Sequence, residues 1–291
     1  MFNLAYVTLS LSLAGSVLAG VPAPAVTKAP TVVARALSTS LPASAGYSAL
    51  PTARVITGSF DGKMVKYDRK GSGGVCQGQT ETGEASAVFI LESGASISNV
   101  IIGKDQAEGI HCRGPCKVTN VWWEDVCEGA YLELFGFDAP YRHVYRRYHY
   151  SNEKQIKQTG AGDVSTITGG GAFSASDKIV QHNGAGKVVI KDFFASTFGK
   201  LYRSCGNCSK SYARTVVVDN VCLKGGSEAV GINSNFGDTA TLTNIKTNGK
   251  PSNANVCCTY KGVGSGSEPS KIGCGDSYAA CKYTASAVGS C

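Results

Sequence analysis

The chain has 291 residues, with 36 glycines, 12 cysteines and a formal net charge of +7. Its positive charges are dispersed rather than clustered, which argues against a nucleic-acid partner. No stretch is long and apolar enough for a membrane-spanning helix, so we expect none. The mildly basic balance fits an acidic extracellular polymer, although net charge alone decides little.

The N-terminus predicts export. An apolar run from Leu4 to Leu18 ends in Val17-Leu18-Ala19, which has the small-residue spacing of a signal-peptidase site. Residues 1–19 are therefore interpreted as a secretory signal peptide, and the mature protein is expected to be secreted. Residues 20–51 are rich in Ala, Val, Pro, Ser and Thr, which predicts a low-complexity leader or pro-segment. Residues 52–291 are long enough for one large domain.

The cysteines predict disulfides. Their number is even, and a signal peptide places them in an oxidising compartment. Cys205-Gly-Asn-Cys208 is also compatible with zinc or redox chemistry, but no second such pair and no suitably spaced histidine accompanies it. The pairing of the cysteines stays open.

Short apolar runs predict an all-β solenoid. They recur along the chain at 87–91, 98–102, 118–123, 164–168, 188–194, 215–221 and 240–245. Most are separated by about 15–25 residues with Gly, Asn or Asp turn signals, which is a solenoid period. An Asn recurs in the phrases around Asn99, Asn120, Asn220 and Asn244, where stacked turns can form a hydrogen-bonded ladder. We expect a parallel β-helix rather than an antiparallel sandwich, which favours clean alternation and tight hairpins.

The segment Asp177 to Cys208 concentrates groups that do chemistry. A strand-like core over residues 187–194 is flanked by polar clusters, with Lys178 before it and Arg203 after it. Residues one repeat apart become neighbours on one face of a solenoid. The sequence therefore predicts concentrated positive charge here, and an acidic ligand.

Carboxylates predict a cation site. Glu108 and Glu128 are 20 residues apart, about one coil, so the two side chains can share an ion. Oxygen ligands of this kind suit Ca²⁺ rather than zinc. His111 and His182 are candidate acid–base groups, but we favour hydrogen bonding within the turns for both.

One segment fits no strand period. Residues 129–154 interleave aromatic and basic side chains, a pattern that can hold sugar rings or a polyanion. We favour a loop or an insertion that lies outside the repeat.

Several motifs together resemble the polysaccharide lyase family 3 pectate lyases. They are Asn99-Val-Ile-Ile-Gly103, Ala107-Glu-Gly-Ile-His111, Val121-Trp-Trp-Glu-Asp-Val126, Asp177-Lys-Ile-Val-Gln-His-Asn183, Gly199-Lys-Leu-Tyr-Arg-Ser-Cys-Gly-Asn-Cys208 and Val230-Gly-Ile-Asn-Ser-Asn-Phe-Gly-Asp238. The resemblance covers about residues 54 to 265, except the insertion. It implies a right-handed, single-stranded parallel β-helix and a Ca²⁺-dependent, endo-acting lyase on polygalacturonate. We also expect a monomer.

The resemblance also assigns roles by position. Glu108 and Glu128 match calcium ligands of the family, and Lys178 and Arg203 match its catalytic base and arginine, with Asp177 beside them. Glu84 is the best match for a further family glutamate, with Glu81 as the alternative. The implied reaction is β-elimination: a base removes the C5 proton of a galacturonate, and the C4 oxygen leaves to give a 4,5-unsaturated product. Lys178 and Arg203 can exchange the roles of base and carboxylate-binding group.

The sequence departs from the family at one point. Where the family reads Glu-Asp-Ala, this chain reads Glu128-Gly129-Ala130 and then continues into the 129–154 segment. We interpret that segment as an insertion extraneous to the family fold, with a translated intron as the hypothesis for its origin. The departure leaves open a non-catalytic pectin-binding β-solenoid. A hydrolase is less favoured, because it needs paired carboxyl groups and the prominent pair here is cationic.

Overall fold

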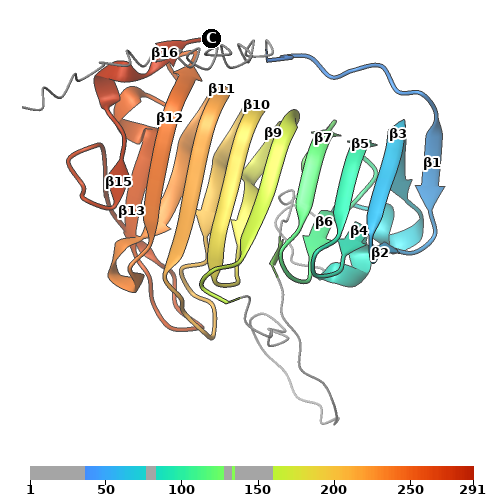
Figure 1. Cartoon of the computed structure of the whole chain (residues 1–291), viewed down its shortest axis with the longest axis horizontal. Coiled ribbons are helices and arrows are strands. Elements are labelled where there is room, and N and C mark those ends of the chain that lie inside the picture. The colour runs from blue at the N-terminus through green and yellow to red at the C-terminus, as the bar shows by residue number, and fades with distance from the viewer. Residues whose placement is uncertain (1–36, 77–82, 128–132, 135–159) are drawn as a thin grey trace, which may run out of the picture. The chain divides into compact units, whose positions relative to one another are not determined.

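More than half of the described residues are in β-strands, and nearly all of the strand pairings are parallel. The computed structural model describes residues 37–76, 83–127, 133–134 and 160–291 (Figure 1). Twelve strands belong to the larger sheet: β1 (Tyr47–Leu50), β3 (Ser59–Arg69), β5 (Ser96–Ile102), β7 (Lys117–Trp123), β9 (Val164–His182), β10 (Gly186–Ser204), β11 (Arg214–Asn233), β12 (Thr239–Thr247), β13 (Cys257–Lys261), β14 (Ser270–Cys274), β15 (Cys281–Lys282) and β16 (Gly289–Ser290). Four form a second sheet: β2 (Arg54–Ile56), β4 (Ala87–Leu91), β6 (Glu108–Cys112) and β8 (Glu133–Leu134).

The described helical segments are short 3-10 turns. They are η1 (Gly71–Gly74), η2 (Glu84–Ser86), η3 (Ser234–Phe236), η4 (Asn253–Val256) and η5 (Ala285–Ala287). Within the described ranges, no helix has the length and apolarity needed to cross a bilayer.

The order of the strands identifies a coiled chain. In the larger sheet β3, β5, β7, β9, β10, β11 and β12 lie side by side and run parallel (Figure 1). The strands skipped between β1 and β9 form the second sheet, in the order β2-β4-β6-β8. The chain therefore passes from one sheet to the other and returns one strand further along. This is the right-handed parallel β-helix that the sequence predicts.

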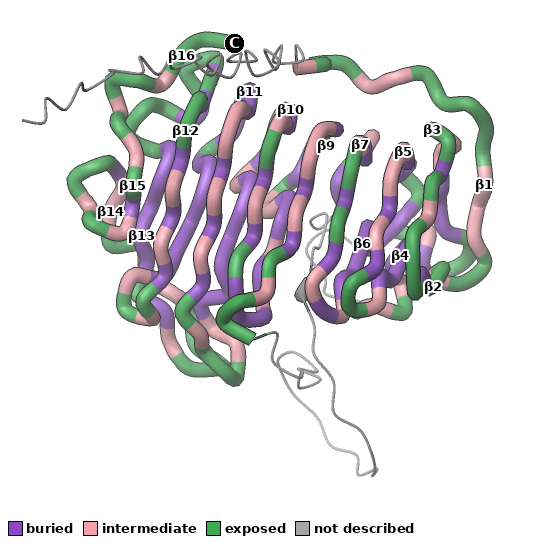
Figure 2. Tube along the Cα trace, in the orientation of Figure 1, coloured by how far each residue is buried: buried purple, intermediate pink, exposed green. Residues whose placement is uncertain are grey.

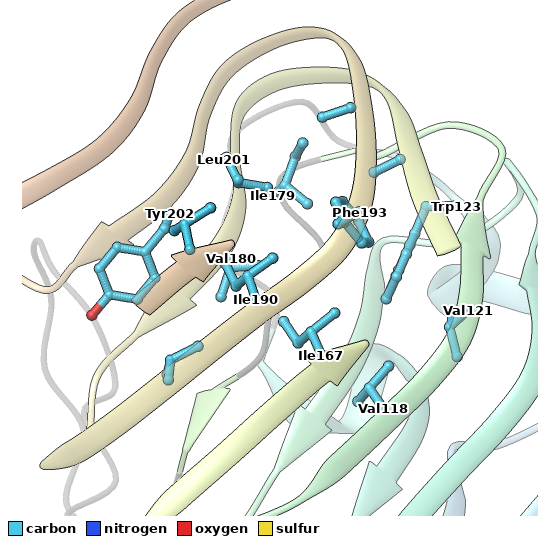
Figure 3. Close-up of a cluster of buried hydrophobic side chains, with 14 of the residues drawn as sticks. Val118, Val121, Trp123, Ile167, Ile179, Val180, Ile190, Phe193, Leu201 and Tyr202 are labelled. Atoms are coloured by element: carbon cyan, nitrogen blue, oxygen red, sulfur yellow. The ribbon is translucent and has the colours of Figure 1, made fainter. Parts of the chain in front are cut away.

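The core is made of like side chains stacked from coil to coil. Strand register aligns one column of buried residues: Ile97, Val118, Ile167, Ile190, Val218 and Leu242. Figure 3 shows Ile167, Ile190, Phe193 and Trp123 pointing into a shared interior. Burying each such side chain contributes about 1.5–3 kcal/mol to the stability of the fold. Burial of these regularly spaced apolar side chains is therefore the main force that stacks the coils.

A corner of several coils carries the recurring asparagine. Asn99, Asn120, Asn220 and Asn244 all have φ between 51° and 53°, a left-handed conformation that Asn tolerates well. The Nδ2 of Asn120 donates to Oδ1 of Asn99 at 2.9 Å, and Nδ2 of Asn244 donates to Oδ1 of Asp219 at 2.8 Å. The predicted turn ladder is therefore present.

Two boundaries differ from the sequence prediction. Strand β1 pairs with β3, so residues 47–50 belong to the sheet and not to the leader. Further upstream, Leu37 and Leu41 pack on a second apolar cluster that includes Trp122. The low-complexity composition of residues 37–50 does not reveal these contacts, because a short strand and two leucines are enough to attach the segment to the β-helix. Strand β8 pairs with β6, so part of the predicted 129–154 insertion also joins a sheet.

All twelve cysteines form disulfides, as predicted. The pairs are Cys76–Cys127, Cys112–Cys116, Cys205–Cys208, Cys222–Cys291, Cys257–Cys281 and Cys258–Cys274. The Cys205–Cys208 bond uses both sulfurs of the candidate zinc or redox pair, which removes them as thiolate ligands.

Candidate active site

Two lysines face each other across neighbouring coils. Lys178 near the end of β9 is in register with Lys200 on β10, and Lys200 is in register with Glu228 on β11. The strands carry these polar side chains because their alternate neighbours, such as Ile179 and Leu201, are fully buried in the core. Figure 2 shows the same alternation of buried and less buried residues along β9–β11. Stacking therefore brings together charges that are remote in sequence.

Asp177 joins the two lysines. Its carboxylate forms an ion pair with Lys178 and a second one with Lys200, whose Nζ lies 3.3 Å from Oδ1. Burial acts to raise the pKa of Asp177, but the two lysines outweigh it and hold that pKa below its usual value. Asp177 is consequently ionised at neutral pH and bridges both ammonium groups.

Arg203 lies three residues beyond Lys200 on the same strand. The guanidinium stacks 4.0 Å from the ring centre of Tyr260, and its NH1 donates to Oδ1 of Asn233 at 3.0 Å. Only 8% of Arg203 is exposed, and burial lowers its pKa. In the part of the chain that the structure describes, no carboxylate pairs with it. Its remaining N–H donors are therefore not committed to an internal counter-ion.

Glu228 adds a buried negative charge next to Arg203. Its Oε1 accepts a hydrogen bond from the Tyr260 hydroxyl at 2.7 Å and lies 2.5 Å from Nζ of Lys271. Burial, reinforced by Glu228, raises the pKa of Tyr260, which therefore stays a neutral donor. Of these six charged groups, Asp177 and Glu228 offset only two of the four positive charges, which leaves a net positive site.

The structure brings most of the predicted cluster together but changes the neighbours. Lys178, Asp177 and Arg203 lie on adjacent strands as expected, yet Arg203 is in register with Gln181 rather than with Lys178. The direct neighbour of Lys178 is Lys200, which the sequence analysis did not select. The repeat spacing could have identified Lys200, because Lys200 and Arg203 both lie about one coil after Lys178.

Glu84 has a different partner. On η2, its two carboxylate oxygens accept from Nε and NH2 of Arg113 at 3.0 and 2.6 Å. Arg113 also binds Glu92, at 2.7 Å. This forked ion pair fixes Glu84 beside β4, and the described contacts do not link it to Lys178 or Lys200. Glu81 lies outside the described residues.

The predicted calcium ligands are described in part. Glu108 begins β6, is completely buried, and places Oε2 3.3 Å from Nε2 of His111. Close by in sequence, the Oε1 atom of Gln106 is buried without a hydrogen-bond partner in the described chain. Carboxylate and amide oxygens suit calcium. Glu128 lies outside the described residues, and those that are described contain no cluster of three potential ligand side chains. The donor chemistry fits calcium, while the described residues alone do not complete a ligand set.

His182 has a structural role, as the sequence analysis favours. It is completely buried, and its Nε2–H donates to the Ala185 carbonyl at 3.1 Å. Nδ1 is then the acceptor for the Tyr202 hydroxyl, at 2.7 Å. Burial, with a smaller contribution from Arg214, lowers the pKa of His182 to about 3. A neutral, fully bonded imidazole is not available to move a proton to or from a ligand.

Comparison with known proteins decides the family. The model of a family described as pectate lyase matches residues 38–133 and 152–267. The chain belongs to the pectate lyase family. The resemblance drawn from the motifs is thus confirmed, and membership makes the chain an enzyme of the pectate lyase class. The residues between the two matched ranges, 134–151, lie within the predicted 129–154 insertion.

Relatives within the pectate lyase family are close. The chain is 49% identical over 214 residues to probable pectate lyase F of Aspergillus terreus, which covers 74% of this chain and 79% of that protein. It is 43% identical over 245 residues to pectate lyase E of Emericella nidulans, which covers 84% of each.

Solved pectate lyases have the same fold. The catalytic domain of pectate lyase PelI from Erwinia chrysanthemi matches with a TM-score of 0.61 and 27% identity, covering 84% of this chain and 100% of that domain. A structure of PelI in complex with tetragalacturonic acid matches with a TM-score of 0.56 and 30% identity, over 81% of this chain and 70% of that one.

Proposed function

We propose that this protein is a secreted pectate lyase that cleaves α-1,4-polygalacturonate by calcium-dependent β-elimination and releases 4,5-unsaturated oligogalacturonates. The observation that carries the proposal is the cationic site formed by Lys178, Lys200 and Arg203 on two adjacent strands. Each residue of polygalacturonate carries a carboxylate, so a net positive surface is its complement. A related pectate lyase has been solved with tetragalacturonic acid, which supports this substrate class.

Arg203 is suited to hold the carboxylate of the reacting sugar. Its planar guanidinium can donate two parallel hydrogen bonds to a carboxylate, and no described acidic side chain occupies those donors. The same donors would stabilise the negative charge that moves onto the carboxylate as the C5 proton is lost.

Lys178 is our choice for the base. In the proposed step its neutral amine takes the C5 proton, the C5–H electron pair forms the C4–C5 double bond, and the C4–O bond breaks. The glycosidic oxygen leaves with the electron pair of the broken C4–O bond and then takes up a proton. Asp177 keeps its second ion pair, with Lys200, when Lys178 is neutral, so the carboxylate is not left without a partner.

Calcium would be held by Glu108 and Glu128. When bound there, the ion would neutralise the substrate carboxylate and make the C5 proton more acidic. Secretion is supported by the signal-like residues 1–19 and by six disulfides, which form in oxidising compartments. Monomeric behaviour is also part of the proposal.

A non-catalytic pectin-binding protein is the second candidate. It is favoured by Gly129, which stands where the family has a ligand Asp, and by the break in the family match between 133 and 152. Sequencing the transcript tests whether residues 129–154 are encoded by the mature message.

The deciding experiment measures ultraviolet absorbance of the unsaturated product on polygalacturonate, with Ca²⁺ and then with excess chelator. We expect a calcium-dependent rise that Lys178→Met abolishes, while Lys187→Met, an exposed lysine at the start of β10, retains it. Folded wild-type protein that binds polygalacturonate without releasing product would instead establish the second candidate.

A further inference from the structure

Arg203 reaches across a whole strand to contact Tyr260. In register, Arg203 on β10 is followed by Gly231 on β11 and then by Cys258 on β13. A Cβ atom on Gly231 would lie 3.0 Å from Cδ of Arg203 and 3.2 Å from Cε2 of Tyr260. Contacts this short are tighter than ordinary packing, so the missing side chain at 231 opens the path that Arg203 occupies.

A buried amide holds the far end of the guanidinium. Asn233 is fully buried, and its Nδ2 donates to the carbonyls of Ser204 at 3.2 Å and Cys205 at 3.0 Å. These bonds orient the amide so that Oδ1 accepts from Arg203. A Cβ on Gly206 would lie 2.8 Å from both NH2 of Arg203 and Oδ1 of Asn233. A second glycine thus makes room at this end.

The Tyr260 ring is itself fixed. Its strand, β13, pairs in parallel with β11 and in antiparallel with β14, and Cys258–Cys274 joins the two strands of that hairpin. Its hydroxyl donates to Glu228, which also binds Lys271. The ring under the guanidinium therefore has little freedom to turn.

We propose that Tyr260 and Asn233 are positioning residues for Arg203, which set the plane of its guanidinium so that the remaining donors meet a galacturonate carboxylate. The proposal rests on the carboxylate-binding role given to Arg203 above. A free arginine side chain loses rotamer entropy when it is ordered. Stacking on Tyr260 and the hydrogen bond to Asn233 order the guanidinium before the substrate arrives. Less entropy is then lost on binding, and the bound carboxylate is held in the orientation that reacts.

The first test uses the free protein, with no substrate. We would measure the order parameter of the Arg203 Nε–Hε group by NMR, assigning its signal with Arg203→Lys. Tyr260→Phe keeps the ring and should keep the wild-type order, whereas Tyr260→Leu should lower it. Unchanged order in Tyr260→Leu would overturn the proposal. Should Tyr260→Leu fail to fold, Gly231→Ala, which displaces the Arg203 stem, takes its place with the same expected loss.

The second test is kinetic. Tyr260→Leu should lower kcat about tenfold to a hundredfold, because small misplacements of a binding group cost that much. Tyr260→Phe should stay within about threefold of wild type, and KM should change less than kcat in both. In an Arg203→Lys background, Tyr260→Leu should cost little more, since its effect acts through the guanidinium. A full, additive loss in that background indicates a merely structural role and contradicts the proposal.

The two tests distinguish a failure of the proposed lyase function from a failure of the positioning role of Tyr260. Wild-type protein that releases no unsaturated product refutes the proposed lyase function, while the NMR comparison still decides whether Tyr260 orders Arg203.

Discussion

Lys178 and Lys200 lie opposite each other on β9 and β10, and the carboxylate of Asp177 pairs with both. This bridge explains how two ammonium groups can be held close together in a partly buried site. It also gives Lys200 a role that is distinct from that of Lys178: it is the partner that keeps Asp177 paired throughout the proposed reaction.

Replacing Lys200 should weaken catalysis without unfolding the protein. Lys200→Met leaves Asp177 with a single partner, so the carboxylate would hold the Lys178 amine in their ion pair and away from the substrate. We expect kcat to fall about tenfold or more, less than the 10²–10⁴-fold loss typical of removing a general base, which we expect for Lys178→Met. Initial rates on polygalacturonate measure both, with Lys187→Met as the control. Equal activity of Lys200→Met and wild type would remove Lys200 from the site.

Substrate binding should weaken with salt. The site has four positive side chains and only two carboxylates, those of Asp177 and Glu228. The positive side chains are Lys178, Lys200, Arg203 and Lys271, and Lys271 is about half exposed. Raising NaCl from about 0.05 to 0.5 M shortens the screening length severalfold, so KM should rise severalfold while kcat changes little. The check is a titration at fixed free Ca²⁺. A KM that is independent of salt would show that these charges do not attract the polymer.

Acid should destabilise the fold through His182. Its pKa is about 3 in the folded state and 6.5 in the unfolded chain, so below pH 6.5 the unfolded state binds the extra proton. The contribution of His182 is thus complete above pH 6.5 and is lost as the pH falls from 6.5 towards 3. At full extent it is on the order of 5 kcal/mol, by the linkage of 1.36 kcal/mol per pKa unit.

Chemical denaturation at several pH values tests this expectation. His182→Gln keeps a neutral hydrogen-bonding group and should flatten the fall in unfolding free energy between pH 7 and 4. The same slope in wild type and variant would mean that other groups cause the acid sensitivity.

Gly169 offers a site for stabilisation. It occupies the corner position between Asn120 and Asp192, with φ of 70°, and a Cβ there would meet atoms of Asn120 no closer than 3.7 Å. Gly169→Asn should fit and extend the amide ladder. We expect a gain of about 1 kcal/mol, or about 2–4 °C in Tm.

The neighbouring glycine is the matched control. A Cβ at Gly170 would lie 1.9 Å from the Val121 carbonyl oxygen, so Gly170→Asn should destabilise the protein strongly. Calorimetry on the two variants compares them directly. A Tm of Gly169→Asn below wild type would contradict the ladder argument.

The fold could be predicted because its signals are local. Runs such as 87–91 are strands in the structure, and the corner asparagines adopt the expected left-handed conformation. The packing of Leu37 and Leu41 on the solenoid could not be predicted from composition, because the contacts of an irregular segment do not repeat along the sequence.

The site could be predicted only in part. The sequence singles out Lys178, Asp177 and Arg203 as candidate functional groups, but their neighbours depend on strand register, which unequal coil lengths obscure. Tyr260 and Glu228 contact Arg203 or each other across coils more than two dozen residues apart, so no sequence motif joins them. Lys271 approaches from an antiparallel hairpin that departs from the repeat altogether.

The two disulfides nearest the C-terminus also affect how the protein responds to proteolysis. Cys281 is bonded to Cys257, and Cys291 is bonded to Cys222 in the middle of β11. A single cut anywhere in residues 282–290 would therefore release no peptide, since the severed tail stays attached to the body of the solenoid. Such a nicked molecule would keep all of its residues until its disulfides are reduced, and would persist in surroundings rich in hydrolytic enzymes.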